Sequence, residues 1–195
     1  MLYLVRYGQT EFNAIGRWQG QSDSPLTRLG REQAITVAAI LRREIADAGA
    51  TIFSSPLGRA AETAAIIADA LRITQPVIFD DRLKEVRMGS WDGLTSAEIE
   101  DGWPNARNGL GANEWFFHSP DGESYDEMLA RVTAVLESLL CDDIGPKIVV
   151  CHGVTGRIMR GISSGLERGA ELSLDVPQDA AFRLSGTGVV ERLDI

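Results

Sequence analysis

The stretch MLYLVRYGQTEFN, residues 1–13, decides the fold. Its first five residues have strong apolar character and are followed by Arg6 and Gly8, which is the pattern of a buried parallel strand that opens into a loop. Open α/β sheets bind their ligands at the carboxyl ends of such strands. We therefore expect Arg6 to direct a permanently charged, forked guanidinium into that crevice. Gly8 would let the backbone approach the ligand closely.

Length and composition limit the class of protein. The 195 residues fit one domain, 1–195, and the apolar fraction of 44% is that of an ordinary globular protein. A net charge of −9 argues against nucleic-acid and membrane-surface partners, although a few arginines can still form a local positive pocket. Two cysteines without metal-ligand spacing, no apolar run of transmembrane length and no signal-peptide pattern favour the cytoplasm. The oligomeric state is not indicated.

Strands and helices alternate along the chain. The expected strands after the first are residues 51–54, 76–80, 147–151, 181–184 and 189–194, and the expected helices are residues 27–48, 56–71, 154–162 and one that begins at Ser124. Ser55 and Pro56 form a start signal, with serine as the N-cap and proline as the first helical residue. This order predicts a three-layer α/β/α sandwich around a mainly parallel sheet.

Residues 94–122 form a long excursion that is mostly irregular. It is rich in glycine, asparagine and proline, yet it contains Trp103, Trp115 and Phe116. A long irregular segment with this many aromatic residues is typical of a lid over a site. We expect these three side chains to border the mouth of a pocket. The alternative is that the aromatic residues fill a satellite core.

Three motifs resemble those of the histidine phosphatase superfamily, the phosphoglycerate mutase-like family. Residues 4–27 resemble its opening motif of arginine, histidine, glycine, an acid or glutamine, and threonine, except that Tyr7 stands in place of the histidine. Residues 54–64 resemble the second motif and contain Arg59, and His152-Gly153 resembles the third. The resemblance covers nearly the whole chain and implies a phosphoglycerate mutase-like fold.

The resemblance also implies a phosphate pocket without a metal or cofactor. Arg6, Arg59 and His152 would surround the phosphoryl group, because guanidinium forks match its oxygens two at a time. Asn13 and backbone N–H groups beginning at Gly153 would add phosphate contacts.

Three further residues are expected to act on the substrate. Thr10 and Gln19 occupy positions expected to contact it. Glu85 lies in residues 83–93, which resemble the family segment ending in glycine, tryptophan, an acid and glycine. It would protonate the alkoxide that leaves when a phosphate ester is cleaved.

Tyr7 determines how much of the family's chemistry applies. In the family an imidazole at this position attacks phosphorus, whereas a phenol is largely protonated at neutral pH and must be activated first. The phenol oxygen also reaches further from the backbone and would intrude on the space of the phosphate. Three interpretations stay open: a natural non-catalytic member, an altered copy of an active phosphatase, and a tyrosine-using variant, which this geometry disfavours.

The expected function follows from these points. The resemblance implies hydrolysis of a small phosphorylated metabolite, impaired by Tyr7. The alternative is a binding or regulatory protein with the same pocket and no turnover. A phosphoglycerate mutase is disfavoured, because the chain is too short for the larger insertions of the mutases.

Overall fold

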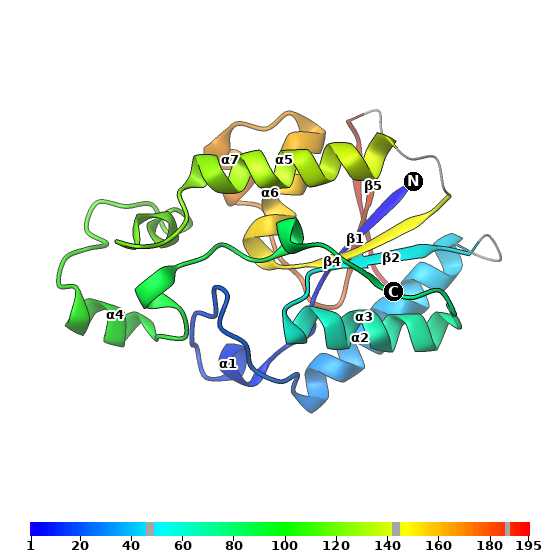
Figure 1. Ribbon diagram of the computed structural model, residues 1–195, viewed down its shortest axis with the longest axis horizontal. Helices are drawn as coiled ribbons and strands as arrows, with labels where there is room; N and C mark the ends of the chain where they lie inside the picture. The colour runs from blue at the N-terminus through cyan, green and yellow to red at the C-terminus, as the bar shows by residue number, and fades with distance from the viewer. Residues whose placement is uncertain (46–48, 142–144, 186–187) are drawn as a thin grey trace.

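The computed structural model describes residues 1–45, 49–141, 145–185 and 188–195 (Figure 1). Its sheet has the strand order β3-β2-β4-β1-β5-β6. The strands are β1 (Leu2–Arg6), β2 (Thr51–Ser54), β3 (Ile78–Phe79), β4 (Lys147–Cys151), β5 (Ala181–Leu184) and β6 (Val190–Leu193). Parallel pairs join β1 to β4, β4 to β2 and β2 to β3, whereas β5 and β6 pair antiparallel. The predicted mainly parallel sheet is confirmed.

The helices cover both faces of this sheet. They are α1 (Glu11–Ala14), α2 (Arg28–Ile45), α3 (Gly58–Leu71), α4 (Ser96–Gly102), α5 (Tyr125–Cys141), α6 (Gly153–Ser164) and α7 (Arg168–Leu172), with 3-10 turns η2 (Asp81–Leu83), η3 (Gly89–Trp91) and η4 (Trp115–His118). Figure 1 shows α2 and α3 on one side of the strands and α5 and α6 on the other. The predicted three-layer α/β/α sandwich is confirmed.

The alternation of side chains along β1 explains the two layers. Leu2 and Leu4 pack in one core cluster with residues of α5 and α6, whereas Tyr3 and Val5 pack in the other with residues of α2 and α3. Successive strand residues point to opposite faces of the sheet, so a strand that is apolar at every position must be covered by other elements on both faces. The run at residues 1–5 therefore specifies a central strand.

Several predicted boundaries differ from the structure. The strand expected over residues 76–80 is confined to Ile78–Phe79. The helix expected to begin at Pro56 begins at Gly58, with Leu57 as an N-cap that has no side-chain cap bond. The expected end of the helix over residues 27–48 and part of the turn between β5 and β6 lie outside the described residues.

Ser55 makes a local bond as well as a distant one. Its Oγ accepts the Leu57 N–H at 3.3 Å, the bond that the predicted N-cap would make, although α3 begins only at Gly58. The same Oγ lies 2.8 Å from Nε2 of His152, 97 residues away, a contact that no local pattern predicts.

The excursion at residues 94–122 contains α4 and η4. Ring centroids of Trp103 and Trp115 lie 6.2 and 5.8 Å from that of Trp91, which is fully buried. These tryptophans therefore extend the core. No helix in the described parts of the chain has the length and apolar character needed to cross a membrane.

Candidate phosphate-binding site

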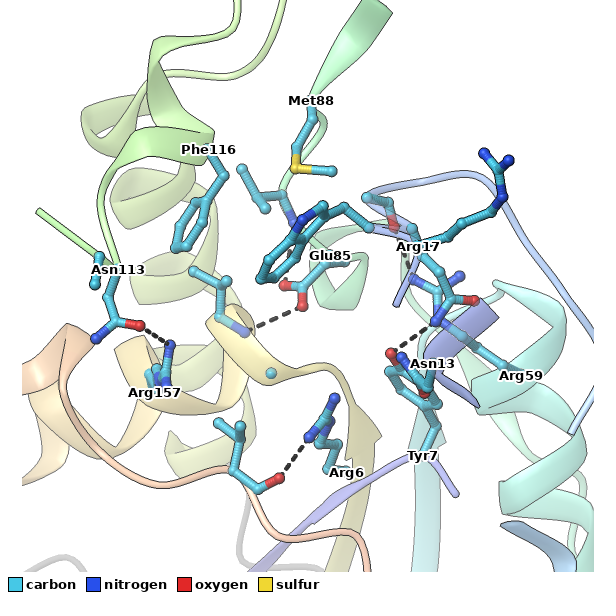
Figure 2. Close-up of a pocket in the computed structure, with 18 residues that line it drawn as sticks. Arg6, Tyr7, Asn13, Arg17, Arg59, Glu85, Met88, Asn113, Phe116 and Arg157 are labelled. Carbon is cyan, nitrogen blue, oxygen red and sulfur yellow. Dashed lines mark hydrogen bonds between the residues drawn. The ribbon is translucent and has the colours of Figure 1, made fainter. Parts of the chain in front are cut away.

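A pocket of ≈ 280 Å³ lies beyond the carboxyl ends of β1 and β4 (Figure 2). Of the predicted site residues, those that line it are Arg6, Tyr7, Asn13, Gln19, Arg59, Glu85 and Gly153. These residues come from segments that are distant in the sequence but adjacent in the sheet, since β1 and β4 are parallel neighbours. His152 and Thr10 do not line the pocket.

Arg6 and Arg59 both lie against the ring of Tyr7. Their guanidinium carbons are 5.4 and 4.8 Å from the ring centroid. Arg6 donates from Nη1 to the carbonyl oxygen of Val176 at 2.5 Å, and Arg59 donates from Nη2 to that of Gly20 at 2.7 Å. The buried Nε atoms of both arginines have no hydrogen-bond partner in the described structure. Each cation is thus fixed and retains an unused donor.

The phenol of Tyr7 forms part of the pocket wall. The side chain is only 4% exposed, and its hydroxyl accepts a hydrogen bond from Nε2 of Gln19 at 3.0 Å. Gln19 is itself held by Ser24, whose Oγ donates to Oε1 at 3.3 Å. The tyrosine oxygen is therefore oriented by an amide, whereas the two guanidiniums contact the ring.

His152 lies against Tyr7 instead of in the pocket. Its ring centroid is 5.2 Å from that of Tyr7, and its Nε2 is bound to Ser55 while Nδ1 has no partner in the described structure. Burial, together with the neighbouring charges of Arg59 and Arg6, holds the pKa of His152 well below its ordinary value of 6.5. The imidazole is thus neutral at neutral pH. Its predicted contact with phosphate stays a prediction.

Glu85 binds the first turn of α6. Its Oε2 accepts the Val154 N–H, and its Oε1 accepts the Thr155 N–H, each at 3.1 Å. The predicted ligand contact is therefore wrong for the N–H groups of Val154 and Thr155, because both already donate to the carboxylate of Glu85. A Cβ built on Gly153 would lie 3.5 Å from Glu85 Oε2 and 3.8 Å from Arg6 Nε, so acid and cation meet in front of this glycine.

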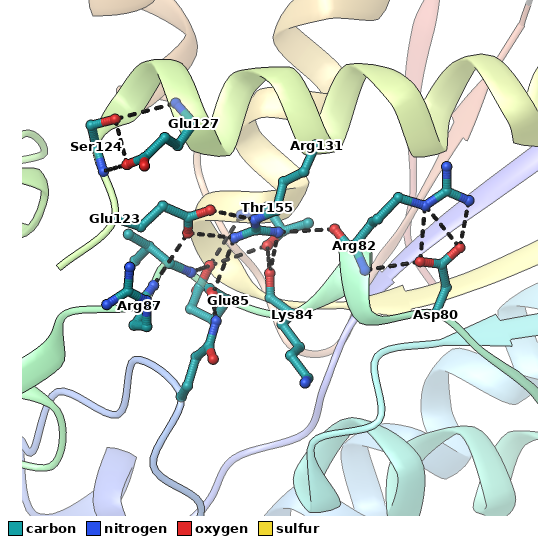
Figure 3. A network of polar contacts seen from close by, with 12 residues as sticks. Asp80, Arg82, Lys84, Glu85, Arg87, Glu123, Ser124, Glu127, Arg131 and Thr155 are labelled. Atoms are coloured by element: carbon teal, nitrogen blue, oxygen red, sulfur yellow. Dashed lines mark hydrogen bonds and ion pairs between the residues drawn. The ribbon is translucent and has the colours of Figure 1, made fainter.

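A polar network behind the pocket fixes the backbone of Glu85 (Figure 3). Arg131 forms a two-pronged pair with Glu123, with Nε–Oε1 at 2.6 Å and Nη2–Oε2 at 2.8 Å. It also donates to the carbonyl oxygens of Arg82, Lys84 and Glu85. One half-buried guanidinium thereby ties α5 to the segment that presents the carboxylate of Glu85.

Asn13 and Thr10 form the cap of α1. The Thr10 hydroxyl accepts the Asn13 N–H at 3.1 Å, and Asn13 Oδ1 accepts the Thr10 N–H at 3.2 Å. Asn13 also reaches the pocket, whereas Thr10 is fully buried. Its buried position and capping bonds give Thr10 a structural role in α1, and its predicted substrate contact stays a prediction.

Gly8 serves a different purpose from the one predicted. It does not line the pocket, and a Cβ at this position would lie 2.1 Å from the carbonyl oxygen of Gly30 in α2. The absent side chain allows the loop after β1 to pack directly on α2.

The sequence reasoning missed Arg157 and Asn113, which face the pocket opposite Tyr7 (Figure 2). Arg157 follows Gly153 by four residues on α6, a spacing that places both on one helix face, so this residue could have been found. Asn113 lies in the excursion, where no periodicity exists. Of the three aromatic residues expected at the pocket mouth, Phe116 lines the pocket; the prediction is wrong for Trp103 and Trp115.

The arrangement is suited to an oxyanion. Arginine forks with spare donors provide charge-assisted hydrogen bonds, and a nearby carboxyl group offers a site for proton transfer. In the portion of the chain that the structure describes, no three His, Cys, Asp or Glu side chains are grouped to hold a metal ion.

Comparison with known proteins gives consistent results. The family model described as histidine phosphatase superfamily (branch 1) matches residues 2–185. A relative from Escherichia coli O1:K1, described as a probable phosphoglycerate mutase GpmB, is 41% identical over 182 residues, covering 89% of this chain and 79% of its own.

Two solved structures share the fold. Bacillus stearothermophilus YhfR has a TM-score of 0.81 at 28% identity and covers 97% of this chain and 93% of its own. A mycobacterial glucosyl-3-phosphoglycerate phosphatase in complex with VO3 has a TM-score of 0.76 at 30% identity, with coverage of 93% and 92%.

Proposed function

The chain belongs to the histidine phosphatase superfamily, branch 1, and on this premise we propose that it binds phosphate monoesters of small molecules with little or no hydrolysis. The observation that carries the proposal is the pair of guanidiniums of Arg6 and Arg59 fixed beside one pocket wall, each with an unused Nε donor. Arg59 also pairs with Asp23 at 3.1 Å, whereas Arg6 has no carboxylate within ion-pair distance among the described residues. In a chain of net charge −9, Arg6 therefore contributes most to the local positive potential that a dianionic phosphate requires.

The position of Tyr7 argues for weak turnover. A tyrosine nucleophile needs a base at its hydroxyl, but the hydrogen-bond partner of this oxygen is the amide of Gln19, which donates to it. Both arginines contact the ring instead of the oxygen. The nearby imidazole of His152 is bound to Ser55. Within the described structure, the hydroxyl therefore lacks the contacts that would activate it.

The relatives support a monoester as the ligand class. One solved relative is described as a glucosyl-3-phosphoglycerate phosphatase and another relative as a probable phosphoglycerate mutase, and both descriptions concern phosphate esters of small molecules. For this chain, hydrolysis is the reaction that a histidine at position 7 would carry out. The proposed partner is thus a small phosphorylated molecule.

Three forms of the chain test the proposal. The unchanged chain should bind inorganic phosphate in isothermal titration calorimetry and release little p-nitrophenol from p-nitrophenyl phosphate. Tyr7→His should hydrolyse this ester and accumulate an acid-labile phosphoenzyme. Tyr7→Phe keeps the ring and removes the hydroxyl, so it should bind phosphate as the unchanged chain does.

The outcomes separate binding from catalysis. Failure of the unchanged chain to bind phosphate would overturn the proposal. Substantial hydrolysis that is lost in Tyr7→Phe would instead identify a tyrosine nucleophile. If Tyr7→His binds phosphate but hydrolyses no ester, the proposal of phosphate binding stands, and the implied descent from a hydrolytic enzyme is wrong.

A further inference from the structure

Gln178 joins the segment that follows α7 to two residues of the pocket. Its Nε2 donates to the carbonyl oxygen of Tyr7 at 3.0 Å and to Oδ1 of Asn13 at 3.3 Å. Tyr7 and Asn13 line the pocket, whereas Gln178 does not. Any effect of Gln178 on a ligand must therefore pass through the residues that it holds.

Backbone groups determine how both side-chain amides are oriented. The Tyr7 carbonyl oxygen can only accept, so the Gln178 atom that faces it is the amide nitrogen. The Thr10 N–H can only donate, so the Asn13 atom that faces it at 3.2 Å is the amide oxygen. Oδ1 of Asn13 then accepts one bond from Thr10 and one from Gln178, which uses both of its lone pairs.

The amide nitrogen of Asn13 is left for a ligand. Among the described residues Nδ2 has no hydrogen-bond partner, although Asn13 lines the pocket on the same side as Tyr7 and Arg59 (Figure 2). Turning the amide over would set its N–H groups against those of Thr10 and Gln178 and would direct its oxygen to the cavity. The two donors thus exclude the orientation that would repel an anion.

We propose that Gln178 is a positioning residue of the pocket, which holds the amide of Asn13 so that Nδ2 donates to an oxyanion beside Arg6 and Arg59. The inference rests on the proposed function, since the oxyanion is the phosphate of that proposal. A neutral donor adds a hydrogen bond without adding to the repulsion between the two cations. Arg6 is held from the same segment, through the carbonyl oxygen of Val176 at 2.5 Å.

A double-mutant cycle tests whether Gln178 acts through Asn13, with inorganic phosphate as the ligand in isothermal titration calorimetry. Asn13→Ala removes a hydrogen bond to a charged group and should weaken phosphate binding about tenfold or more. Gln178→Leu should weaken it less, by about three- to tenfold, because the Thr10 N–H still binds Asn13 Oδ1. The double variant should bind phosphate within about twofold of Asn13→Ala, since the two residues act as one unit.

Two further variants separate positioning from a general loss of structure. Asn13→Asp keeps an acceptor for the N–H groups of Thr10 and Gln178, so its thermal midpoint should stay near that of the unchanged chain, but its charged oxygen replaces the free donor and should abolish phosphate binding. Gln75→Leu makes the same change as Gln178→Leu at an exposed residue outside the pocket and should leave the phosphate affinity unchanged.

The possible failures are distinguishable. If the unchanged chain binds no phosphate, the proposed function falls and this inference with it. If it binds phosphate and Gln178→Leu binds it equally well, only the positioning role is overturned. Additive losses in the double variant would also overturn it, because Gln178 would then act by another route, such as the Tyr7 carbonyl group. Phosphate binding by Asn13→Asp at the original affinity would show that Nδ2 does not contact the ligand.

Discussion

Replacing Arg131 by methionine should destabilise the protein by about 3 kcal/mol, the lower end of the range for breaking a buried ion pair. The lower end applies because the side chains of Arg131 and Glu123 retain 19% and 10% exposure. The change leaves Glu123 without its guanidinium and removes donors from the carbonyl groups of Arg82, Lys84 and Glu85. Most of the loss comes from those acceptors left unpaired.

Urea unfolding measures this loss. With a slope of about 2–3 kcal/mol per molar urea, a loss of about 3 kcal/mol lowers the midpoint by about 1–1.5 M. A single domain typically has about 5–15 kcal/mol of stability, so the variant should still fold. Its phosphate affinity should fall as well, because Arg131 fixes the segment that carries Glu85 (Figure 3).

A double variant separates the pair from its surroundings. Arg131→Met combined with Glu123→Leu leaves neither charge unpaired, so it should lose less stability than the sum of the two single variants. Single-variant losses below about 1 kcal/mol, or strict additivity, would refute the view that this pair is held together by mutual charge compensation.

Two further perturbations have defined outcomes. The neutral, buried His152 has a folded-state pKa below that of the unfolded chain, so its contribution to stability is present above pH 6.5 and is lost as the pH falls below it, by up to about 1.4 kcal/mol per pH unit. Urea midpoints measured from pH 8 to 5 should therefore depend less on pH in His152→Gln than in the unchanged chain. The exposed control His118→Gln should show the same pH dependence as the unchanged chain. Gly8→Ala should lower stability by about 1–3 kcal/mol or more, because its Cβ would lie 2.1 Å from the Gly30 carbonyl oxygen; an unchanged thermal midpoint would show that the loop moves freely.

Local pattern was sufficient to predict the layers, whereas the family resemblance was needed to place Asn13, Gln19, Arg59 and Glu85 at the pocket. The continuous apolar runs of β1 and β4 require cover on both faces, and the residues that follow them must then share one sheet edge. Arg6 and Gly153 were found in this way. Their placement follows from chain geometry alone and needs no knowledge of distant contacts.

Long-range partners explain the failures. Ser55 makes the predicted bond to the Leu57 N–H, but its second contact, with the imidazole of His152, could not be found from local spacing. Glu123 lies before α5 and Arg131 lies within it, so helical periodicity does not indicate their pairing. Trp103 and Trp115 fit the satellite-core alternative and not the lid, because Trp91, which precedes the excursion, packs against both.

The contacts of the Tyr7 ring with Arg6 and Arg59 could not be predicted from the sequence. Sequence reasoning treats the phenol as an intruder in a phosphate pocket, yet its ring lies within 5.4 Å of two guanidinium carbons. Each such cation–π contact is worth about 0.5–2 kcal/mol and offsets part of the repulsion between the cations. The ring therefore supplies some of the compensation that an oxyanion would supply, while the unused Nε donors of Arg6 and Arg59 remain suited to an anion. A tyrosine at this position is thus consistent with a folded pocket that has donors suited to an anion.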